Sequence, residues 1–308
     1  MANIKELSKI PERLTSGHRL CPGCGASIAV RQILMGTDKP VVVGAATGCL
    51  EVATTIYPYT AWNVPFIHNA FENVAATISG VETAYRALKK KGKITKDIKF
   101  IAFGGDGASY DIGLQSMSGV FERGHNLVYV CYDNQAYQNT GVQRSGATPC
   151  GASTTTAPSG KASYGKPQLR KDLTAIAAAH NIPYAAQGSI SHWNDLVTKS
   201  QKAFAVEGPA FLNVLAPCHR GWRYPQEDTI KIAKLAVETG FWPLIEVENG
   251  KWRFTYKPKE RKPIMEFLKT QGRFKHLFKE ENKRVLEEIQ RNTDAQWERL
   301  EKLVQATS

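Results

Sequence analysis

Apolar residues in this chain gather in short runs that end near glycine, aspartate, asparagine or cysteine. The runs are PVVVGA (40–45), IKFIAFGGDG (98–107), NLVYVCYDN (126–134), IPYAAQG (182–188) and PAFLNVLAPC (209–218). Their nearly continuous apolar character is typical of strands that are buried on both faces, as in a parallel sheet. The pattern therefore predicts five such strands.

Segments with helical periodicity separate these runs. Residues 69–90 carry apolar positions at three- and four-residue steps and end in lysines, and shorter helical patterns cover 111–123, 171–180 and 191–206. Strands that alternate with helices indicate an α/β fold with a doubly wound, mostly parallel sheet. In such a sheet the ligand site lies at the carboxyl ends of the strands.

Two segments depart from this alternation. Residues 144–170 are rich in Gly, Ser, Thr and Pro and follow neither period, so we predict a long loop, which is usually functional or mobile. The predicted domains are an α/β domain over residues 1–256 and a C-terminal helical arm over 257–308. The arm carries apolar side chains near one helical face: Val285, Ile289, Trp297, Leu300 and Val304.

Length and charge place further bounds on the protein. A chain of 308 residues is long enough for a large buried core, and its net charge is +12. Residues 251–308 hold fifteen Lys or Arg and nine Asp or Glu, interleaved as on a solvated helical surface. No run of eighteen apolar residues occurs, and the N-terminus lacks an apolar signal segment. We therefore expect a cytoplasmic protein with no membrane partner.

The segment GGDGASYDIG (104–113) follows a predicted strand and places Asp106 at its carboxyl end. Glycines at this position let the backbone approach a phosphate closely. Twenty-six residues separate Gly107 from Asn134, which ends the next predicted strand. A GDG alone indicates only a tight turn, but this crossover length brings two turns together. Asp106, Asn134 and the carbonyl near Ala136 are then expected to share one hard cation such as Mg²⁺.

The cysteines are too few for a disulfide scaffold in a chain this long, so metal or redox chemistry is the better interpretation. Cys21 and Cys24 form a CxxC pair in GHRLCPGCGAS, which fits a redox dithiol, a zinc site or an iron–sulfur site. Cys49 and Cys218 each follow a strand-like run. Both are therefore expected at the same edge of the sheet as Asp106.

Taken together, these motifs resemble those of a known family. GDG, about twenty-six residues and then Asn form the diphosphate-binding motif of thiamine diphosphate enzymes. Six longer segments are similar to those of the beta subunits of 2-oxoacid:ferredoxin oxidoreductases of the pyruvate type, and the similarity extends over about residues 15–280. These segments are HRLCPGCG, ATGCLEV, TAWNVPFIHNAFENVAA, GGDGASYDIG, DNQAYQNTGVQRSGATP and PIMEFLKTQGRFKHL.

The resemblance implies a set of site residues in this sequence. Mg²⁺ would be held by Asp106, Asn134 and the Ala136 carbonyl, and Asn139 would lie beside the thiazolium ring and substrate as a catalytic residue. Thiamine diphosphate would contact a group of eight residues: Gly48, Cys49, Gly105, Asp106, Gly107, Ala108, Asn134 and Ala136.

The resemblance also implies that Cys21, Cys24, Cys49 and Cys218 hold one [4Fe–4S] cluster, since such a cluster takes four thiolates. Four cysteines also bind zinc tetrahedrally, so the cysteines alone leave zinc open. The thiamine motif favours iron–sulfur over zinc.

The implied reaction is the oxidative decarboxylation of pyruvate to acetyl-CoA and CO₂, with single electrons passing through the cluster to ferredoxin. Oxalate, 2-oxoisovalerate and 2-oxoglutarate would use the same machinery with another pocket. The chain offers only the diphosphate-binding half of a thiamine site, which implies alpha-, gamma- and delta-type partner subunits. A structural zinc-binding or a nucleic-acid-binding α/β protein explains the cysteines or the charge but not the paired turns, so no nucleic acid is expected.

Overall fold

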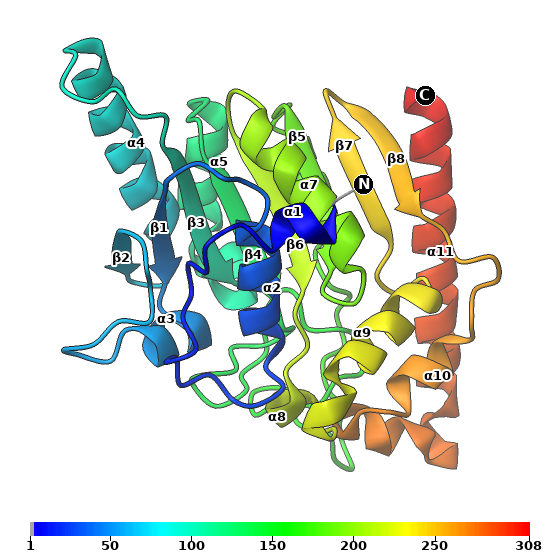
Figure 1. The fold of residues 1–308 in the computed structure, drawn as a ribbon. Coiled ribbons are helices and arrows are strands. Elements are labelled where there is room, and N and C mark those ends of the chain that lie inside the picture. Colours follow the sequence, from blue (N-terminus) through cyan, green and yellow to red (C-terminus); the bar gives the residue numbers. More distant parts are fainter. Residues whose placement is uncertain (1–2) are drawn as a thin grey trace.

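A twisted sheet of eight strands organises the chain (Figure 1), and the computed structural model describes residues 3–308. The strands are β1 (Val41–Ala46), β2 (Phe66–Asn69), β3 (Lys99–Gly105), β4 (Val128–Asp133), β5 (Tyr184–Ser189), β6 (Ala210–Leu215), β7 (Leu244–Glu248) and β8 (Lys251–Tyr256). Their order is β2-β1-β3-β4-β6-β5-β7-β8. The first six in this order are parallel, and β7 and β8 are antiparallel to their neighbours.

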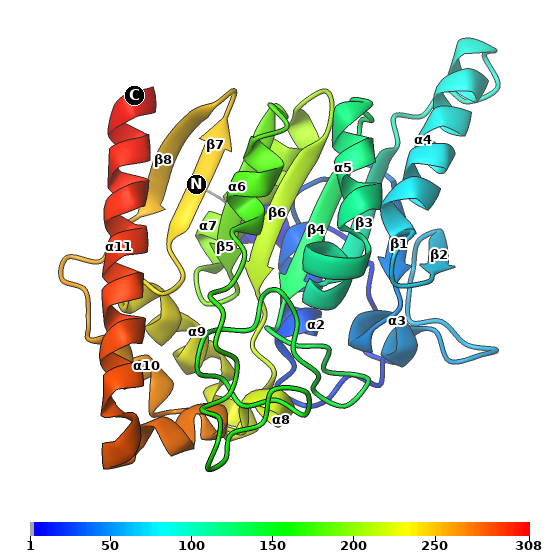
Figure 2. The ribbon, with the colours of Figure 1, turned by 180° about the vertical axis from the view of Figure 1, so that it is seen from behind.

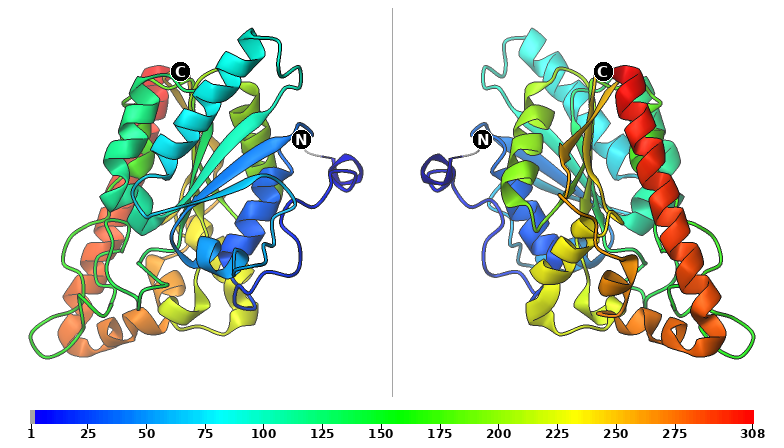
Figure 3. Two further views of the ribbon diagram at one scale, coloured as in Figure 1. Left: turned by 90° about the vertical axis from the view of Figure 1, so that its left-hand side faces the viewer. Right: turned by 90° about the vertical axis from the view of Figure 1, so that its right-hand side faces the viewer.

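Helices cover both faces of the sheet (Figures 2 and 3). They are α1 (Ile4–Leu7), α2 (Gly25–Leu34), α3 (Cys49–Thr54), α4 (Val74–Lys90), α5 (Leu114–Glu122), α6 (Leu173–Ala178), α7 (Trp193–Ala205), α8 (His219–Trp222), α9 (Thr229–Glu238), α10 (Ile264–Leu268) and α11 (Lys283–Thr307). Alternate residues of each strand serve opposite layers. In β3, Ile101 and Phe103 pack with α2 and α7, whereas Phe100 and Ala102 pack with α4, α5 and α6. The predicted doubly wound α/β fold is therefore confirmed.

The five predicted strands correspond to β1, β3, β4, β5 and β6, but two predicted helices begin elsewhere. The helix expected over 69–90 begins at Val74, because residues 66–69 pair with β1 as strand β2. The helix expected over 111–123 is split. Residues 107–112 form a wide π-helical turn, closed by the Gly113 amide on the Ala108 carbonyl, and α5 begins at Leu114.

Residues 144–170 contain no helix or named strand, as predicted, and much of this loop is buried. Beyond β8, the chain forms α10, two 3₁₀ turns (Gly272–Phe278 and Glu280–Asn282) and α11, which runs beside β8 (Figure 2). Leu286 and Ile289 of α11 share a core with Trp222, Phe267 and Phe274. No helix within residues 3–308 has both the length and the apolar character needed to cross a membrane.

The contact between α2 and the segment after β6 permits no side chain at Gly25. The Gly25 amide donates to the Pro217 carbonyl at 3.2 Å, and a Cβ at Gly25 would lie 2.7 Å from the carbonyl carbon of Ala216. These neighbours are backbone atoms, so they cannot move aside as a flexible side chain would. We therefore expect Gly25→Ala to lower the free energy of unfolding by about 1–3 kcal/mol, measured by urea denaturation.

Gly80 is the matched control, because it lies exposed within α4 and a Cβ there meets nothing within 4 Å. Gly80→Ala is expected to raise the free energy of unfolding by about 0.5–1 kcal/mol through helix propensity. Equal stability of Gly25→Ala and the wild type would contradict the close contact at Pro217.

Candidate functional site

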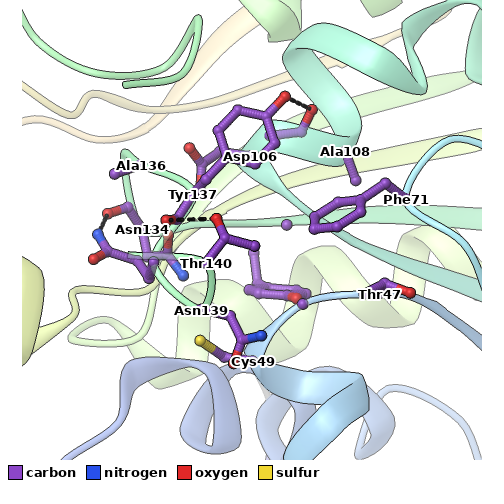
Figure 4. A pocket seen from close by; sticks show the side chains of 15 residues that line it. Thr47, Cys49, Phe71, Asp106, Ala108, Asn134, Ala136, Tyr137, Asn139 and Thr140 are labelled. Carbon is purple, nitrogen blue, oxygen red and sulfur yellow. Dashed lines mark hydrogen bonds between the residues drawn. The ribbon is translucent and has the colours of Figure 1, made fainter. Parts of the chain in front are cut away.

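A pocket lies at the carboxyl ends of β1, β3 and β4, where the strand order changes direction (Figure 4). This is the crevice in which open α/β sheets bind ligands. The structure gathers there all nine pocket positions expected from the sequence: Gly48, Cys49, Gly105, Asp106, Gly107, Ala108, Asn134, Ala136 and Asn139.

Six further residues line the pocket and were not singled out from the sequence: Thr47, Phe71, Tyr132, Tyr137, Gln138 and Thr140. Thr47, Tyr137, Gln138 and Thr140 are each next in the sequence to a predicted residue. This adjacency was the only feature of the sequence that could have indicated them. Phe71 comes from the turn after β2 and packs on Tyr137, with ring centroids 5.9 Å apart. Its position depends on β2, which the sequence pattern did not predict.

Asp106, Asn134 and Ala136 converge at one end of the pocket. The Asn134 terminal amide lies 2.8 Å from both Asp106 Oδ1 and the Ala136 carbonyl oxygen. If its NH₂ faces them, it donates to both; if its oxygen faces them, three oxygens meet at one point. The second arrangement is the one that a hard cation holds. The donor set therefore fits Mg²⁺.

Asp106 is almost fully buried, and Ser145 Oγ donates to its Oδ2 at 2.5 Å. Burial raises the pKa of Asp106 well above its ordinary value, and the nearby Asp133 carboxylate raises this pKa further. A positive charge beside Asp106 favours the ionised carboxylate. A divalent cation at this point would supply that charge.

The turn that aims Asn134 and Ala136 depends on an unusual backbone conformation at Gln135. Gln135 has φ of 65°, which is uncommon outside glycine, and its side chain is fully buried. Its amide donates to Asp133 Oδ1 at 3.0 Å, and Thr148 Oγ1 donates to its carbonyl at 2.7 Å. Trp222 Nε1 donates to the Asn134 carbonyl at 2.7 Å. These contacts from distant segments stabilise the turn.

The pocket walls are shaped for close backbone approach. A Cβ at Gly107 would lie 2.2 Å from the Tyr137 ring, and a Cβ at Gly48 would lie 2.7 Å from the Tyr132 hydroxyl. Tyr137 donates to the Gly107 carbonyl at 3.0 Å, whereas the buried Tyr132 hydroxyl has no partner within the described chain. Glycines that expose backbone amides and an unpaired hydroxyl fit a polar, phosphate-bearing ligand.

The long loop holds Asp106 through a buried lysine. Lys166 is 1% exposed, and its ammonium donates to the carbonyls of Thr148 (2.6 Å) and Ser145 (3.3 Å). It thereby fixes the turn that presents Ser145 to Asp106. Burial lowers the pKa of Lys166 from 10.5 to about 8, and the Arg144 charge adds to this effect.

The four cysteines expected to act together also approach one another. Cys24 precedes α2, Cys49 opens α3, and Cys218 precedes α8. The pKa of Cys24 is raised to about 11, chiefly by burial, and the thiols of Cys218 and Cys21 contribute to this rise. Burial raises the pKa of Cys49 to about 12, and the other three thiols contribute in the same direction. The backbone agrees for two of them, because the Gly25 amide donates to the Pro217 carbonyl at 3.2 Å and thereby brings Cys24 beside Cys218.

All four thiols are free, and within residues 3–308 no three His, Cys, Asp or Glu side chains gather tightly enough to hold a single metal ion. Zinc requires thiolates about 2.3 Å from one ion, whereas a cubane cluster spaces its four cysteines more widely. The cysteine group therefore stays a candidate ligand set, as the sequence predicts. Cys49 belongs to this group and also lines the pocket.

Two other cysteines lie apart from this group. Cys131 is fully buried in the middle of β4, and Cys150 donates to the Pro167 carbonyl at 3.4 Å within the long loop. Close to the pocket, His68 Nδ1 lies 2.5 Å from the buried Glu51 carboxylate, two residues after Cys49. The structure thus separates the two isolated cysteines from the four that meet.

Lys166 generates a prediction about stability and pH. The Lys166 ammonium loses its proton more readily in the folded chain than in the unfolded chain. The free energy of unfolding therefore increases as pH rises from about 8 to 10.5. Relative to Lys166→Met, the wild type is expected to gain free energy of unfolding between about pH 7 and pH 10. Urea denaturation at both pH values measures the gain.

Lys93 is exposed and serves as the control. The difference between wild type and Lys93→Met should stay constant over the same pH interval. A constant difference for Lys166→Met as well would show that the Lys166 ammonium is not desolvated.

Known proteins share both the sequence and the fold. Residues 34–214 match the family model for the thiamine pyrophosphate enzyme, C-terminal TPP binding domain. The chain is 56% identical to pyruvate synthase subunit PorB of Thermotoga maritima, over 99% of this chain and 97% of that protein. It is 43% identical to ketoisovalerate oxidoreductase subunit VorB of Pyrococcus furiosus, over 98% and 97%.

Pyruvate synthase subunit PorB of Methanocaldococcus jannaschii is 53% identical, over 89% of this chain and 93% of that protein. Among solved structures, a 2-oxoglutarate:ferredoxin oxidoreductase from Magnetococcus marinus has the same fold. The TM-score is 0.54 at 20% identity, over 70% of this chain and 76% of that one. The chain therefore belongs to the thiamine diphosphate-binding beta subunits of the 2-oxoacid:ferredoxin oxidoreductase family.

Proposed function

We propose that this chain binds thiamine diphosphate with Mg²⁺ in the pocket and a [4Fe–4S] cluster on Cys21, Cys24, Cys49 and Cys218. In complex with partner subunits, it serves the oxidative decarboxylation of pyruvate to acetyl-CoA and CO₂, with electrons passing to ferredoxin. The observation that carries this proposal is that Cys49 belongs both to the pocket and to the cysteine group. This residue lines the pocket and also lies among the four thiols. A group that donates electrons in the pocket would then adjoin one that accepts them.

The roles of the pocket residues follow from their contacts. Asp106, Asn134 and the Ala136 carbonyl would hold Mg²⁺, since the Asn134 terminal amide lies 2.8 Å from both Asp106 Oδ1 and the Ala136 carbonyl oxygen. The backbone of residues 105–108 would face the diphosphate, because its glycines leave the amides accessible. Asn139 would contact the thiazolium ring and substrate. Bound thiamine diphosphate supplies the electron sink for loss of CO₂ from a 2-oxoacid.

The surface around the pocket supports a role in a larger assembly. Four apolar residues near it are exposed: Val52 (43%), Tyr57 (94%), Tyr59 (75%) and Ile112 (56%). A partner subunit that packs against this side of the pocket would cover these residues. The partners proposed are alpha-, gamma- and delta-type subunits, with ferredoxin and coenzyme A as reaction partners. The alpha-type subunit would cover the other half of the thiamine.

Pyruvate is the proposed substrate because the most similar relatives reported above are pyruvate synthase subunits. A second candidate, 2-oxoisovalerate, is favoured by the 43% identity to a ketoisovalerate oxidoreductase subunit over almost the whole chain. The test is an anaerobic assay of the purified complex with coenzyme A, ferredoxin and pyruvate, 2-oxoisovalerate, 2-oxoglutarate or oxalate. The highest kcat/KM with an acid other than pyruvate would overturn the substrate assignment.

The magnesium site predicts the effect of Asp106→Asn. Loss of the carboxylate removes the only charged group from the proposed ligand set, so Mg²⁺-dependent binding of thiamine diphosphate should weaken more than about 100-fold. Calorimetric titration of the anaerobic complex measures this affinity. Asp97→Asn, at an exposed position near the opposite end of β3, is expected to bind as the wild type does. Unchanged affinity in Asp106→Asn would exclude this aspartate from the site.

The cysteine group predicts the effect of Cys218→Ser. The wild-type chain should hold about four irons and four sulfides in the cysteine group, and the variant should lose most of both. Iron and acid-labile sulfide per chain are measured after anaerobic purification, with zinc determined in parallel. Cys150→Ser is the control, because Cys150 lies in the long loop. One zinc in place of the iron and sulfide would refute the cluster and favour a structural zinc site.

A further inference from the structure

Arg273 is a buried cation whose position the proposed function does not explain. It is 2% exposed and lies in the 3₁₀ turn between α10 and α11. Within residues 3–308, no carboxylate lies within 4.0 Å of its guanidinium, whereas arginine is seldom fully buried without such a partner. An unpaired charge at this depth is unfavourable unless something else compensates it.

The guanidinium instead contacts two amides and two rings. It donates to Gln135 Oε1 at 2.6 Å and to Gln271 Oε1 at 2.9 Å. It stacks over the Trp222 ring at 3.8 Å from the centroid and lies 4.9 Å from that of Phe274. The planar fork and face of arginine make all these contacts at once, which lysine cannot do.

Two of these contacts involve residues that hold the turn at 134–136, which carries proposed Mg²⁺ ligands. Gln135 is the residue with positive φ between Asn134 and Ala136, so its side chain anchors the turn. Trp222 donates to the Asn134 carbonyl at 2.7 Å. Arg273 thus contacts two of the groups that fix the backbone of the turn with the proposed cation ligands.

The same contacts lead to the cysteine group. Trp222 ends α8, and its amide donates to the Cys218 carbonyl at 2.9 Å. Burial raises the pKa of Cys218, and the positive charge of Arg273 opposes that shift. Burial lowers the pKa of Arg273 to about 9, and the charges of Tyr224, Asp133, Cys218 and Asp106 oppose this. The geometry gives the same connection, because Arg273 stacks on Trp222, whose amide bonds to Cys218, and donates to Gln135 in the turn that carries Asn134.

We propose that Arg273 is a positioning residue that locks the Asn134–Ala136 turn and supplies a buried positive charge to the group bound at Cys218. This inference rests on the proposed function. Reduction by one electron adds one negative charge to a cluster, so a fixed cation nearby stabilises the reduced form. The cluster is consequently easier to reduce with Arg273 than without it. The electron comes from the 2-oxoacid and leaves to ferredoxin.

The experiment uses the anaerobic complex with three variants. Arg273→Met removes the charge and keeps the length, Arg273→Lys keeps the charge and loses the fork, and Gln135→Met breaks the bond to the turn. Two quantities are measured for each: the reduction potential of the cluster by titration followed with EPR, and the affinity for thiamine diphosphate with Mg²⁺. Neither readout depends on turnover.

The two parts of the proposal predict different results. Arg273→Met should lower the equilibrium constant for one-electron reduction about tenfold, or 59 mV for a one-electron couple, and should weaken cofactor binding. Arg273→Lys and Gln135→Met should weaken cofactor binding about tenfold and leave the potential near that of the wild type. If Arg273 had only a structural role, the reduction potential of the cluster would equal that of the wild type in every variant that contains a full cluster.

Arg261→Met is the matched control on the same arm. Arg261 stacks over Trp297 at 5.2 Å and pairs with Asp294 at 2.7 Å, away from the cysteines. Neither measured quantity should change in this variant. A wild-type potential in cluster-loaded Arg273→Met overturns the electrostatic part. Wild-type cofactor affinity in Arg273→Lys and Gln135→Met overturns the positioning part.

If Arg273→Met fails to fold, Arg273→Lys decides the inference, because it keeps the charge and tests the fork alone. A lowered potential in Arg273→Lys with full cluster content would then overturn the electrostatic part. Failure of the proposed function gives a separate result, since the wild-type complex would then contain no cluster signal. Unchanged cofactor affinity in the variants would overturn the positioning part even then.

Discussion

The parallel pairing of β3 with β4 buries two carboxylates side by side. Gly105 is in register with Tyr132, so the next residues, Asp106 and Asp133, leave neighbouring strand ends together. Burial raises the pKa of Asp106, and the Asp133 carboxylate raises this pKa further, because like charges repel strongly where water is excluded. Much of the polar structure around the pocket compensates this repulsion.

Asp133 is neutralised within the chain. Arg170 pairs with it at 3.1 Å, and Tyr110 donates to the same oxygen at 2.7 Å. Arg170 also stacks over Trp242 at 4.4 Å, and Asn213 donates to the Tyr110 hydroxyl at 2.9 Å. Asp106, by contrast, has only hydrogen bonds. The protein thus neutralises one carboxylate internally and keeps the other available for a cation.

The sequence pattern alone predicts the buried strands and the two turns at the pocket, because both depend on residues that are near one another in the sequence. Five buried strands follow from continuous apolar runs, and the spacing from Gly107 to Asn134 places two turns together because consecutive parallel strands are adjacent. Strand β2 was missed because it has only four residues and partial burial. Strands β7 and β8 were also missed, and β8 is largely exposed. The division of the chain after residue 256 stays a prediction, although α11 and α9 contribute to one core.

The supporting residues could not be predicted because each acts over a long sequence distance. Ser145 reaches Asp106 across 39 positions, and Arg273 reaches Gln135 across 138. Nothing in the local pattern distinguishes these residues from surface polar residues, and Lys166 lies in a loop where a solvated lysine is the usual expectation. The conformation of Gln135 is likewise fixed by its tertiary contacts, because its residue type does not favour positive φ.

The position of Cys49 has a mechanical consequence. It is the first residue of α3, directly after the Gly48 that shapes the pocket wall, and α3 follows β1 without a flexible linker. Cys49 therefore ties one member of the cysteine group directly to the wall of the pocket. In the proposed function, the span between the pocket and the cluster would then be set by the fold of this chain and not by the way in which its partner subunits pack.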